Sequence, residues 1–293
     1  MTFLFHKLQY NRNRNKNRFL YRRLYMRPVY VKPVIICVAK FESDYIEEFV
    51  KYHLAIGFDT IYIYDNEEIP TYASLLSKYA DKIVVIHKPT KPVQYEALRD
   101  FVVNHMNTNN ITHVAHIDVD EFITLKKHAN IKDFIREYIV GNCAGIGMNW
   151  RFFGSSGHTE KTNLPVTERF TMCEANGNPH IKTLFHVHFF GRFNTCHAIH
   201  IKPRYYKHHI KSTNGTILTS PFNYNIDFSV IQLNHYKCKT LPEYQYIRTR
   251  GFADHNAKIQ NREEINNNFK IYDMNETQEL TAFNFYKQIT NNK

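Results

Sequence analysis

The chain has 293 residues, of which 43% are hydrophobic and 15% aromatic. This length and apolar content exclude a disordered chain and allow one large α/β domain, alone or with an appendage. The formal net charge of +11 resembles that of a nucleic-acid-binding protein, but residues 1–41 hold ten Lys or Arg and no acid. The rest of the chain has 28 basic and 27 acidic residues, so the body is nearly neutral.

Residues 1–32 form a basic leader rich in Asn and Arg. We expect it to be solvated and flexible; contact with an anionic membrane surface or nucleic acid and an import function are the alternatives. No apolar run approaches the roughly 18 residues of a membrane span, and Phe3–Phe5 is too short for a signal peptide. Five cysteines without a paired spacing favour free thiols. The expected location is the cytoplasm, with peripheral membrane contact as the alternative.

Beyond the leader, strand and helix patterns alternate. Expected strands cover 34–39, 60–65, 82–86 and the run from His113 to Asp118, and expected helices cover 45–56, 71–79 and 92–106. This series predicts an α/β fold with a mostly parallel, Rossmann-like central sheet covered by helices. From Gly141 an irregular, aromatic-rich half replaces the alternation, and helical patterns return at 241–250 and in the tail.

The stretch His113–Phe122 reads as a buried strand that ends in Asp118 and Asp120. Strand periodicity puts both carboxylates on one face and turns Val119 away. Such oxygens suit Mg²⁺ or Mn²⁺, which proteins hold with one or two carboxylates and a substrate diphosphate. Ligands of open α/β sheets bind at the carboxyl ends of strands. The residues therefore predict a metal-dependent enzyme that acts on a nucleotide diphosphate.

Other polar residues join this edge or stay ambiguous. The loops Lys40–Glu42 and Asp65–Asn66 open at the same edge and could hold a base and ribose, although Asp65–Asn66 could equally be only a turn. His235 follows a strand-like run and is either a third metal ligand or an ordinary hydrogen-bonded histidine. The histidines between 186 and 209 lack the closed ligand spacing of a zinc site. No nucleophile elbow, P-loop or dinucleotide fingerprint occurs.

Several segments together resemble the glycosyltransferase family 2-like and family 92-like enzymes over roughly residues 34–255. The segments that carry this resemblance, in order, are Val38–Gly57, Ile63–Asn66, Asp118–Phe122, Asn149–His158, Asn234–Tyr236 and Arg250–Asp254. The resemblance implies a GT-A type fold and Mn²⁺- or Mg²⁺-dependent transfer of a hexose to a hydroxyl of a glycan or glycoconjugate. It implies a nucleotide diphosphate sugar as the donor, usually a UDP-sugar.

The same resemblance implies a domain division and site residues. A glycosyltransferase domain would span 33–255, with a nucleotide-sugar half at 33–140, an acceptor half at 141–255, and a helical tail at 256–293. The implied metal ligands are Asp118, Asp120 and His235. The residues expected near base, ribose or phosphate are Lys40, Glu42, Asp65, Asn66, Asp118, Lys182 and Lys239. The acceptor side would include Trp150, Arg151 and His158.

The catalytic base stays open between Asp254, Asp227 and Glu174, with Asp254 favoured because it ends the last matching segment. A retaining enzyme would need no such base. Two rival functions also stay open. A metal-dependent nucleotide-sugar phosphohydrolase would use the same carboxylates, and a basic nucleic-acid-binding protein would explain the leader but not the neutral body or the carboxylate strand.

Overall fold

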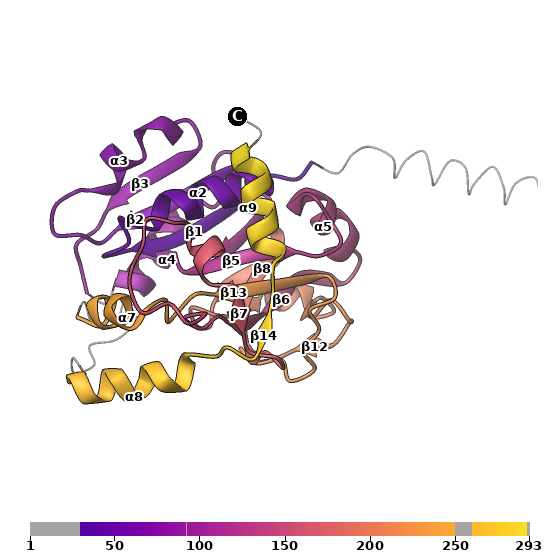
Figure 1. The fold of residues 1–293 in the computed structure, drawn as a ribbon. Coiled ribbons are helices and arrows are strands. Elements are labelled where there is room, and N and C mark those ends of the chain that lie inside the picture. Colours follow the sequence, from indigo (N-terminus) through magenta and orange to yellow (C-terminus); the bar gives the residue numbers. More distant parts are fainter. Residues whose placement is uncertain (1–29, 92, 250–259, 292–293) are drawn as a thin grey trace, which may run out of the picture. The chain divides into compact units, whose positions relative to one another are not determined.

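The computed structural model describes residues 30–91, 93–249 and 260–291 (Figure 1). The chain divides into two compact units, residues 1–31 and 32–293. Most of the leader, and the predictions made for it, lie outside the described residues. The second unit is a mixed α/β structure with a large central sheet flanked by helices, which confirms the predicted fold class.

The main sheet has ten strands in the described residues, in the order β12-β11-β6-β8-β4-β1-β2-β3, with β13 pairing both β5 and β6. Strands β4, β1, β2 and β3 are parallel to one another, whereas β8 is antiparallel to both β4 and β6. The bounds are β1 Pro33–Ala39, β2 Thr60–Asp65, β3 Ile83–His87, β4 His113–His116, β5 Glu121–Leu125, β6 Cys143–Phe152, β8 Asn178–His186, β11 His209–Lys211, β12 Ile217–Leu218 and β13 Ile231–His235. Two small sheets pair β9 (Phe190–Phe193) with β10 (Ile199–Ile201) and β7 (Met172–Cys173) with β14 (Thr277–Gln278).

Helices pack on the sheet because its central strands are apolar on both faces. Val34 and Ile36 of β1 belong to the same core cluster as Leu98 and Phe101 of α4. Helix α2 contacts β2 and β5, and α9 contacts β5. The helices are α2 Ile46–Ala55, α3 Tyr72–Leu75, α4 Val93–Asn104, α5 Ile131–Tyr138, α6 Val166–Arg169, α7 Leu241–Arg248, α8 Arg262–Tyr272 and α9 Thr281–Asn291.

Two expected elements end earlier than the sequence suggests. The helix expected over 71–79 leaves the α conformation at Leu76 and continues as a short 3₁₀ turn, Ser77–Tyr79. The strand expected to carry Asp118 and Asp120 ends at His116. Both aspartates lie instead in the tight connection to β5, where the Glu121 amide donates to the carbonyl of Asp118 at 3.0 Å. Their proximity therefore comes from a turn, and the prediction from strand alternation was wrong.

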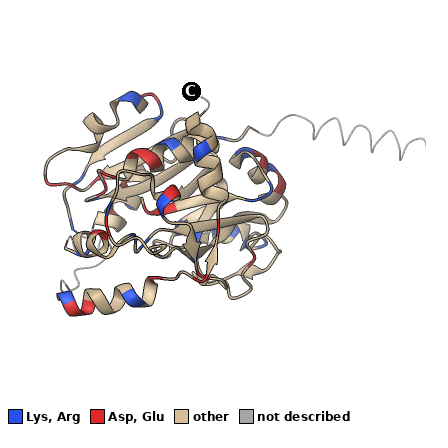
Figure 2. Cartoon of the chain, in the orientation of Figure 1, with Lys and Arg blue, Asp and Glu red and all other residues tan. Residues whose placement is uncertain are grey.

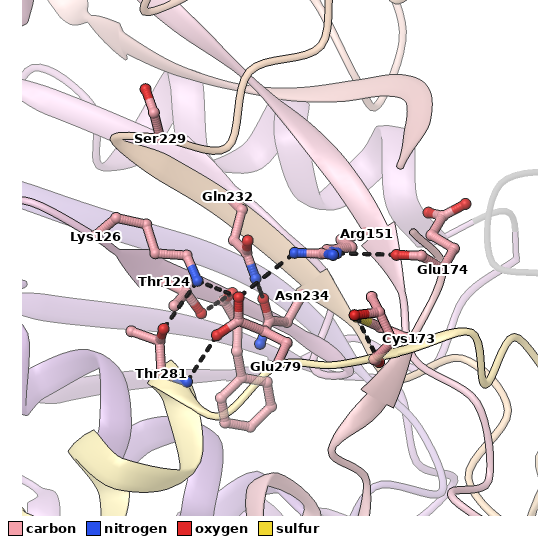
Figure 3. Close-up of polar contacts among 12 residues, drawn as sticks. Thr124, Lys126, Arg151, Cys173, Glu174, Ser229, Gln232, Asn234, Glu279 and Thr281 are labelled. Atoms are coloured by element: carbon pink, nitrogen blue, oxygen red, sulfur yellow. Dashed lines mark hydrogen bonds and ion pairs between the residues drawn. The ribbon is translucent and has the colours of Figure 1, made fainter. Parts of the chain in front are cut away.

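The described tail, residues 260–291, contains the helices α8 and α9, and its short strand β14 pairs with β7. Figure 3 shows the hydrogen bonds and ion pairs that link the tail to the main sheet. Glu279 forms an ion pair with Lys126 and lies 3.5 Å from Arg151, while Thr281 donates its amide to Glu279 at 2.7 Å. These groups join α9 to β5 and β6.

The charge distribution of the described residues agrees with the nearly neutral body expected from the sequence. Figure 2 shows Lys and Arg interspersed with Asp and Glu over the described elements. Within the described part of the chain, none of the helices has both the length and the apolar composition that crossing a membrane requires.

Candidate active site

The turn between β4 and β5 brings two carboxylates, Asp118 and Glu121, to one buried lysine. Lys182 reaches from β8 and its Nζ lies 3.1 Å from Asp118 Oδ2 and 3.7 Å from Glu121 Oε2. The amide of Asp118 also donates to Glu121 Oε2 at 2.8 Å. Gln94 of α4 donates to the other oxygen of Asp118 at 3.3 Å. Antiparallel β8 thus brings a cation from a distant part of the chain to two carboxylates after the end of β4.

Burial and neighbouring charges shift the pKa values of Lys182, Asp118 and Glu121 in different directions. Burial opposes the charge of Lys182, but Asp118 and Glu121 outweigh it and raise the pKa of the ammonium. Burial also opposes ionisation of Asp118, yet Lys182 and His116 hold the pKa of that carboxyl below its usual range. The pKa of Glu121 is raised well above its usual range, because burial and the charges of Asp118 and Asp120 exceed the help from Lys182. Asp118 is therefore the carboxylate that Lys182 keeps ionised.

Asp120 lies on the other side of this turn, beside His235. Strand β13 pairs His235 with Glu121 of β5 and with Phe152 of β6, and the Tyr236 amide donates to the carbonyl of Asp120 at 2.8 Å. This pairing puts His235 Nε2 3.5 Å from Asp120 Oδ2. Burial lowers the pKa of His235, which Asp120 only partly opposes, so the imidazole is neutral near pH 7. Neutral imidazole is the form that binds metal ions.

The donors suit a divalent cation only together with a substrate. In residues 30–91, 93–249 and 260–291, no group of three or more His, Cys, Asp or Glu side chains is arranged to hold a metal. Asp118 is engaged by Lys182 and Gln94, which leaves Asp120 and His235 as a two-residue donor set. Mg²⁺ and Mn²⁺ commonly take one or two protein ligands and fill the other positions with phosphate oxygens and water. The residues fit such a site.

Of the residues expected near the nucleotide base and ribose, Asp65 and Asn66 hydrogen-bond to backbone groups of the neighbouring loops. Asp65 accepts the amides of Glu67, Thr71 and Tyr72 at 2.7–3.1 Å. Asn66 donates its side-chain amide to the carbonyls of Lys88 and Thr90. Glu42 is buried, and Lys40 Nζ lies 5.7 Å from the centre of the Phe41 ring.

Phe41, which the sequence analysis did not single out, is a half-buried aromatic residue in the loop after β1. It has a left-handed backbone (φ 60°), and its amide donates to Glu67 at 2.5 Å. Its ring stacks on Tyr246 of α7, with centroids 5.3 Å apart. A non-glycine residue with positive φ in a loop at a strand end is a frequent mark of a functional site.

Lys239 has the environment of an anion-binding residue. It is 1% exposed, also has a positive φ (55°), and its Nζ has no hydrogen-bond partner among the described residues. The ammonium lies 4.4 Å from the centre of the Tyr45 ring, beside the loop after β1. A buried cation without a hydrogen-bonding partner is costly, and a phosphate oxygen would satisfy it.

The three expected acceptor residues do not converge. Trp150 packs against His235, with ring centroids 4.6 Å apart. Arg151 points to the other face of β6, where it contacts the carbonyl of Glu174 and the carboxylate of Glu279 (Figure 3). His158 lies against Phe170. Only Trp150 therefore lies next to the Asp120 and His235 pair.

The candidate bases also separate. Glu174 accepts the Phe152 amide at 2.7 Å, and burial raises its pKa. Asp227 accepts the Ser229 amide at 2.9 Å and precedes β13, at the end of that strand opposite His235. Asp254 lies outside the described residues. Glu174 is thus held at the Phe152 amide of β6, and Asp227 lies at the far end of β13 from His235.

A buried ion pair beside the site escaped sequence reasoning. Arg169 donates from both terminal nitrogens to Glu243, at 3.0 and 2.9 Å, and the Tyr45 hydroxyl donates to the same carboxylate at 2.7 Å. Although burial opposes ionisation, the hydrogen bonds from Arg169, Thr240 and Tyr45 lower the pKa of Glu243 to about 2. The Thr240-to-Glu243 spacing is the signature of a helix capping box, which was detectable, whereas Arg169 as a partner was not.

The described residues form a mostly parallel sheet with an Asp-x-Asp turn at the carboxyl end of β4, and antiparallel strands extend the sheet, as expected for a Rossmann-like α/β fold. Residues 32–278 match the model of Glycosyltransferase family 92, and the chain belongs to this family. It is therefore a glycosyltransferase, as the sequence predicted. No match was found among curated proteins. A solved structure of UDP-glucose pyrophosphorylase complexed with UDP-glucose is 10% identical, with 90% of this chain and 98% of that chain covered and a TM-score of 0.30.

Proposed function

We propose that this glycosyltransferase transfers a hexose from a nucleoside diphosphate sugar, with UDP-sugars the first candidates, to a hydroxyl of a glycan or glycoconjugate. We also propose that Mn²⁺ or Mg²⁺ binds between Asp120, His235 and the donor diphosphate. The observation that carries the proposal is the approach of His235 Nε2 to within 3.5 Å of Asp120 Oδ2, although the two residues are far apart in the sequence.

Each residue has a separate task in this proposal. The metal, when bound, would offset negative charge on the departing diphosphate. Asp118, kept ionised by Lys182, would accept hydrogen bonds from the donor ribose. Lys239 would bind a phosphate oxygen, because its buried ammonium has no hydrogen-bond partner among the described residues. Phe41 would stack on the base, and Asp65 and Asn66 would fix the loops that enclose it.

The single tryptophan of the chain gives a direct test, because Trp150 packs on His235. Mn²⁺ is paramagnetic and quenches nearby indole fluorescence, whereas Mg²⁺ does not. With UDP present, Mn²⁺ should quench the emission of the wild-type protein, and excess Mg²⁺ should reverse the quenching. Asp120→Asn keeps the side-chain volume but removes the charge, so it should abolish quenching while circular dichroism stays unchanged.

Asp133→Asn is the matched control, because Asp133 lies on the exposed surface of α5 and pairs with its helix neighbour Arg136. It should quench like the wild type. Quenching of Asp120→Asn at wild-type Mn²⁺ concentrations would refute the metal site. A collapsed dichroism spectrum would show instead that Asp120 is structural.

The base and the sugar can be assigned with a thermal-shift screen of nucleotide sugars, with and without Mn²⁺. A ligand that binds only the folded state stabilises it by about 2.7 kcal/mol at a hundred times its Kd. Stabilisation by UDP-hexoses that requires Mn²⁺ is expected. Turnover of the stabilising sugar by water alone, without dependence on any acceptor, would favour the phosphohydrolase instead.

A further inference from the structure

A row of aromatic rings leads from the proposed metal site to the surface. Trp150, which packs on His235, stacks on His180 with centroids 5.0 Å apart and planes 22° apart. His180 contacts Phe222 edge-on at 4.6 Å, and Phe222 stacks with Tyr224 at 6.3 Å and 24°. Exposure grows along the row, from the buried Trp150 to Tyr224, which is 81% exposed.

The outer part of the row is held in place by the backbone. The main chain around Phe222 bridges to His180, because the Ile181 amide donates to Pro221 and the Asn223 amide donates to Pro179. Asn149, next to Trp150 on β6, fixes the same segment. Its amide donates to the carbonyl of Asn223 at 3.0 Å, and the Asn223 amide donates back to Asn149 Oδ1 at 2.7 Å. The exposed rings are therefore presented on a rigid support, which lowers the entropic cost of binding a ligand.

The side chains that hydrogen-bond around the outer rings are mainly amides and hydroxyls, with the carboxylate of Asp227 nearby, which accepts from Thr213. Asn214 donates to the carbonyl of Asn225 at 3.1 Å, and Asn225 donates to the hydroxyl of Thr216 at 3.1 Å. At the inner end, the indole N–H of Trp150 is buried and has no acceptor among the described residues. Aromatic faces pack against the C–H faces of sugar rings, while amides and hydroxyls exchange hydrogen bonds with sugar hydroxyls. This chemistry matches a neutral carbohydrate.

We infer that the row Trp150, His180, Phe222 and Tyr224 binds the acceptor, and that the acceptor is a neutral glycan of two or more sugars. The inference rests on the proposed function, since its inner end at His235 is where the donor would react. The terminal sugar would lie at Trp150 and His180, where the indole N–H would donate to one of its oxygens. The preceding sugars would lie along Phe222 and Tyr224. This path differs from the one expected through Arg151 and His158, whose side chains point elsewhere.

Tyr224→Ala tests the inference without a risk to folding, because the side chain is almost fully exposed. Tyr206→Ala is the matched control, since Tyr206 is 73% exposed and lies outside the row. We would measure binding of the wild type and both variants to an array of neutral mono-, di- and trisaccharides, with UDP and Mn²⁺ present. The wild type should retain some di- or trisaccharides. Tyr224→Ala should bind these at least fivefold more weakly and leave any monosaccharide binding unchanged, and Tyr206→Ala should match the wild type.

Equal binding of these glycans by Tyr224→Ala and the wild type would overturn the inference, as would a wild type that retains no glycan of the array. The quenching of Trp150 by Mn²⁺ and UDP separates this failure from failure of the proposed function. If quenching persists while glycans do not bind, only the aromatic row loses its role. If quenching is absent, the donor and metal assignment fails by itself.

Discussion

Replacing Glu243 by Gln should destabilise the protein far more than an ordinary surface substitution. The amide keeps the shape of the carboxylate but removes its charge, and it leaves the guanidinium of Arg169 buried without its counter-ion. The pKa of Glu243 falls from an ordinary 4.5 to about 2 on folding, which corresponds to about 3 kcal/mol of stabilisation near neutral pH. The carboxylate is 3% exposed, so solvent screening reduces this value little. Breaking a buried pair typically costs roughly 3–5 kcal/mol, in the same range.

The pH dependence follows from the direction of the pKa shift. Because the folded-state pKa of Glu243 is depressed, its contribution is complete above the unfolded-state value and is lost as the pH falls from about 4.5 to about 2. At pH 7 the variant should melt roughly 6–12 °C below the wild type, since 1 kcal/mol shifts the Tm of a domain of this size by about 2–4 °C. At pH 3 the gap should be clearly smaller.

Differential scanning calorimetry at pH 7 and pH 3 would measure both gaps. Glu263→Gln is the matched control, because Glu263 is exposed in the first turn of α8. A Glu243→Gln melting temperature within 2 °C of this control at pH 7 would refute the reasoning. A large gap of equal size at both pH values would show that the lost packing, and not the charge, matters.

Three further predictions concern the site and the leader. His235→Ala should raise the Mn²⁺ concentration needed for donor binding, measured by calorimetry, because the metal loses one protein ligand and a water molecule fills that position with weaker binding. Wild-type metal dependence together with a lower Tm would make His235 a packing residue. Lys182→Met should move the acid limb of UDP binding to higher pH, because Asp118 loses the charge that holds its pKa down; an unchanged pH profile would contradict this role. Deletion of residues 1–32 should leave transfer activity within a few-fold, since β1 begins at Pro33; a folded but inactive truncation would show that the leader helps to build the site.

The regular elements of the first half were predictable because their signals are local. Continuous apolar runs gave β1 and β2 almost to the residue, since both faces of these strands are covered. The amphipathic pattern of α2 and the glycine after it placed that helix within one residue of its observed ends. By contrast, the turn at Asp118 was mistaken for strand because hydrophobicity continues through Ile117 and Val119, although the Ile117 amide makes the last hydrogen bond to β1 and the chain turns directly after it.

The chemistry of the site was less predictable because it depends on partners distant in the sequence. Asp118 and Asp120 have the same residue type and lie two positions apart, yet one is held by Lys182 and the other lies beside His235. No spacing rule distinguishes them, since strand pairing decides which side chains meet. Asp65 shows the converse, because its turn geometry was one of the two expected interpretations, and its carboxylate does accept backbone amides. Its predicted contact with ribose stays a prediction.

The antiparallel insertion of β8 has a consequence for synthesis of the chain. Ribosomes release β4 well before β8, and the growing protein meanwhile presents an apolar strand with one unpaired edge. During the same interval Asp118 lacks Lys182, the cation that keeps its carboxyl ionised in the folded protein. Addition of β8 therefore pairs the free edge of β4 and supplies this cation in a single event. A nascent chain stalled before this point would be a natural client for chaperones, and segments ending before β8 should accumulate in inclusion bodies when expressed alone.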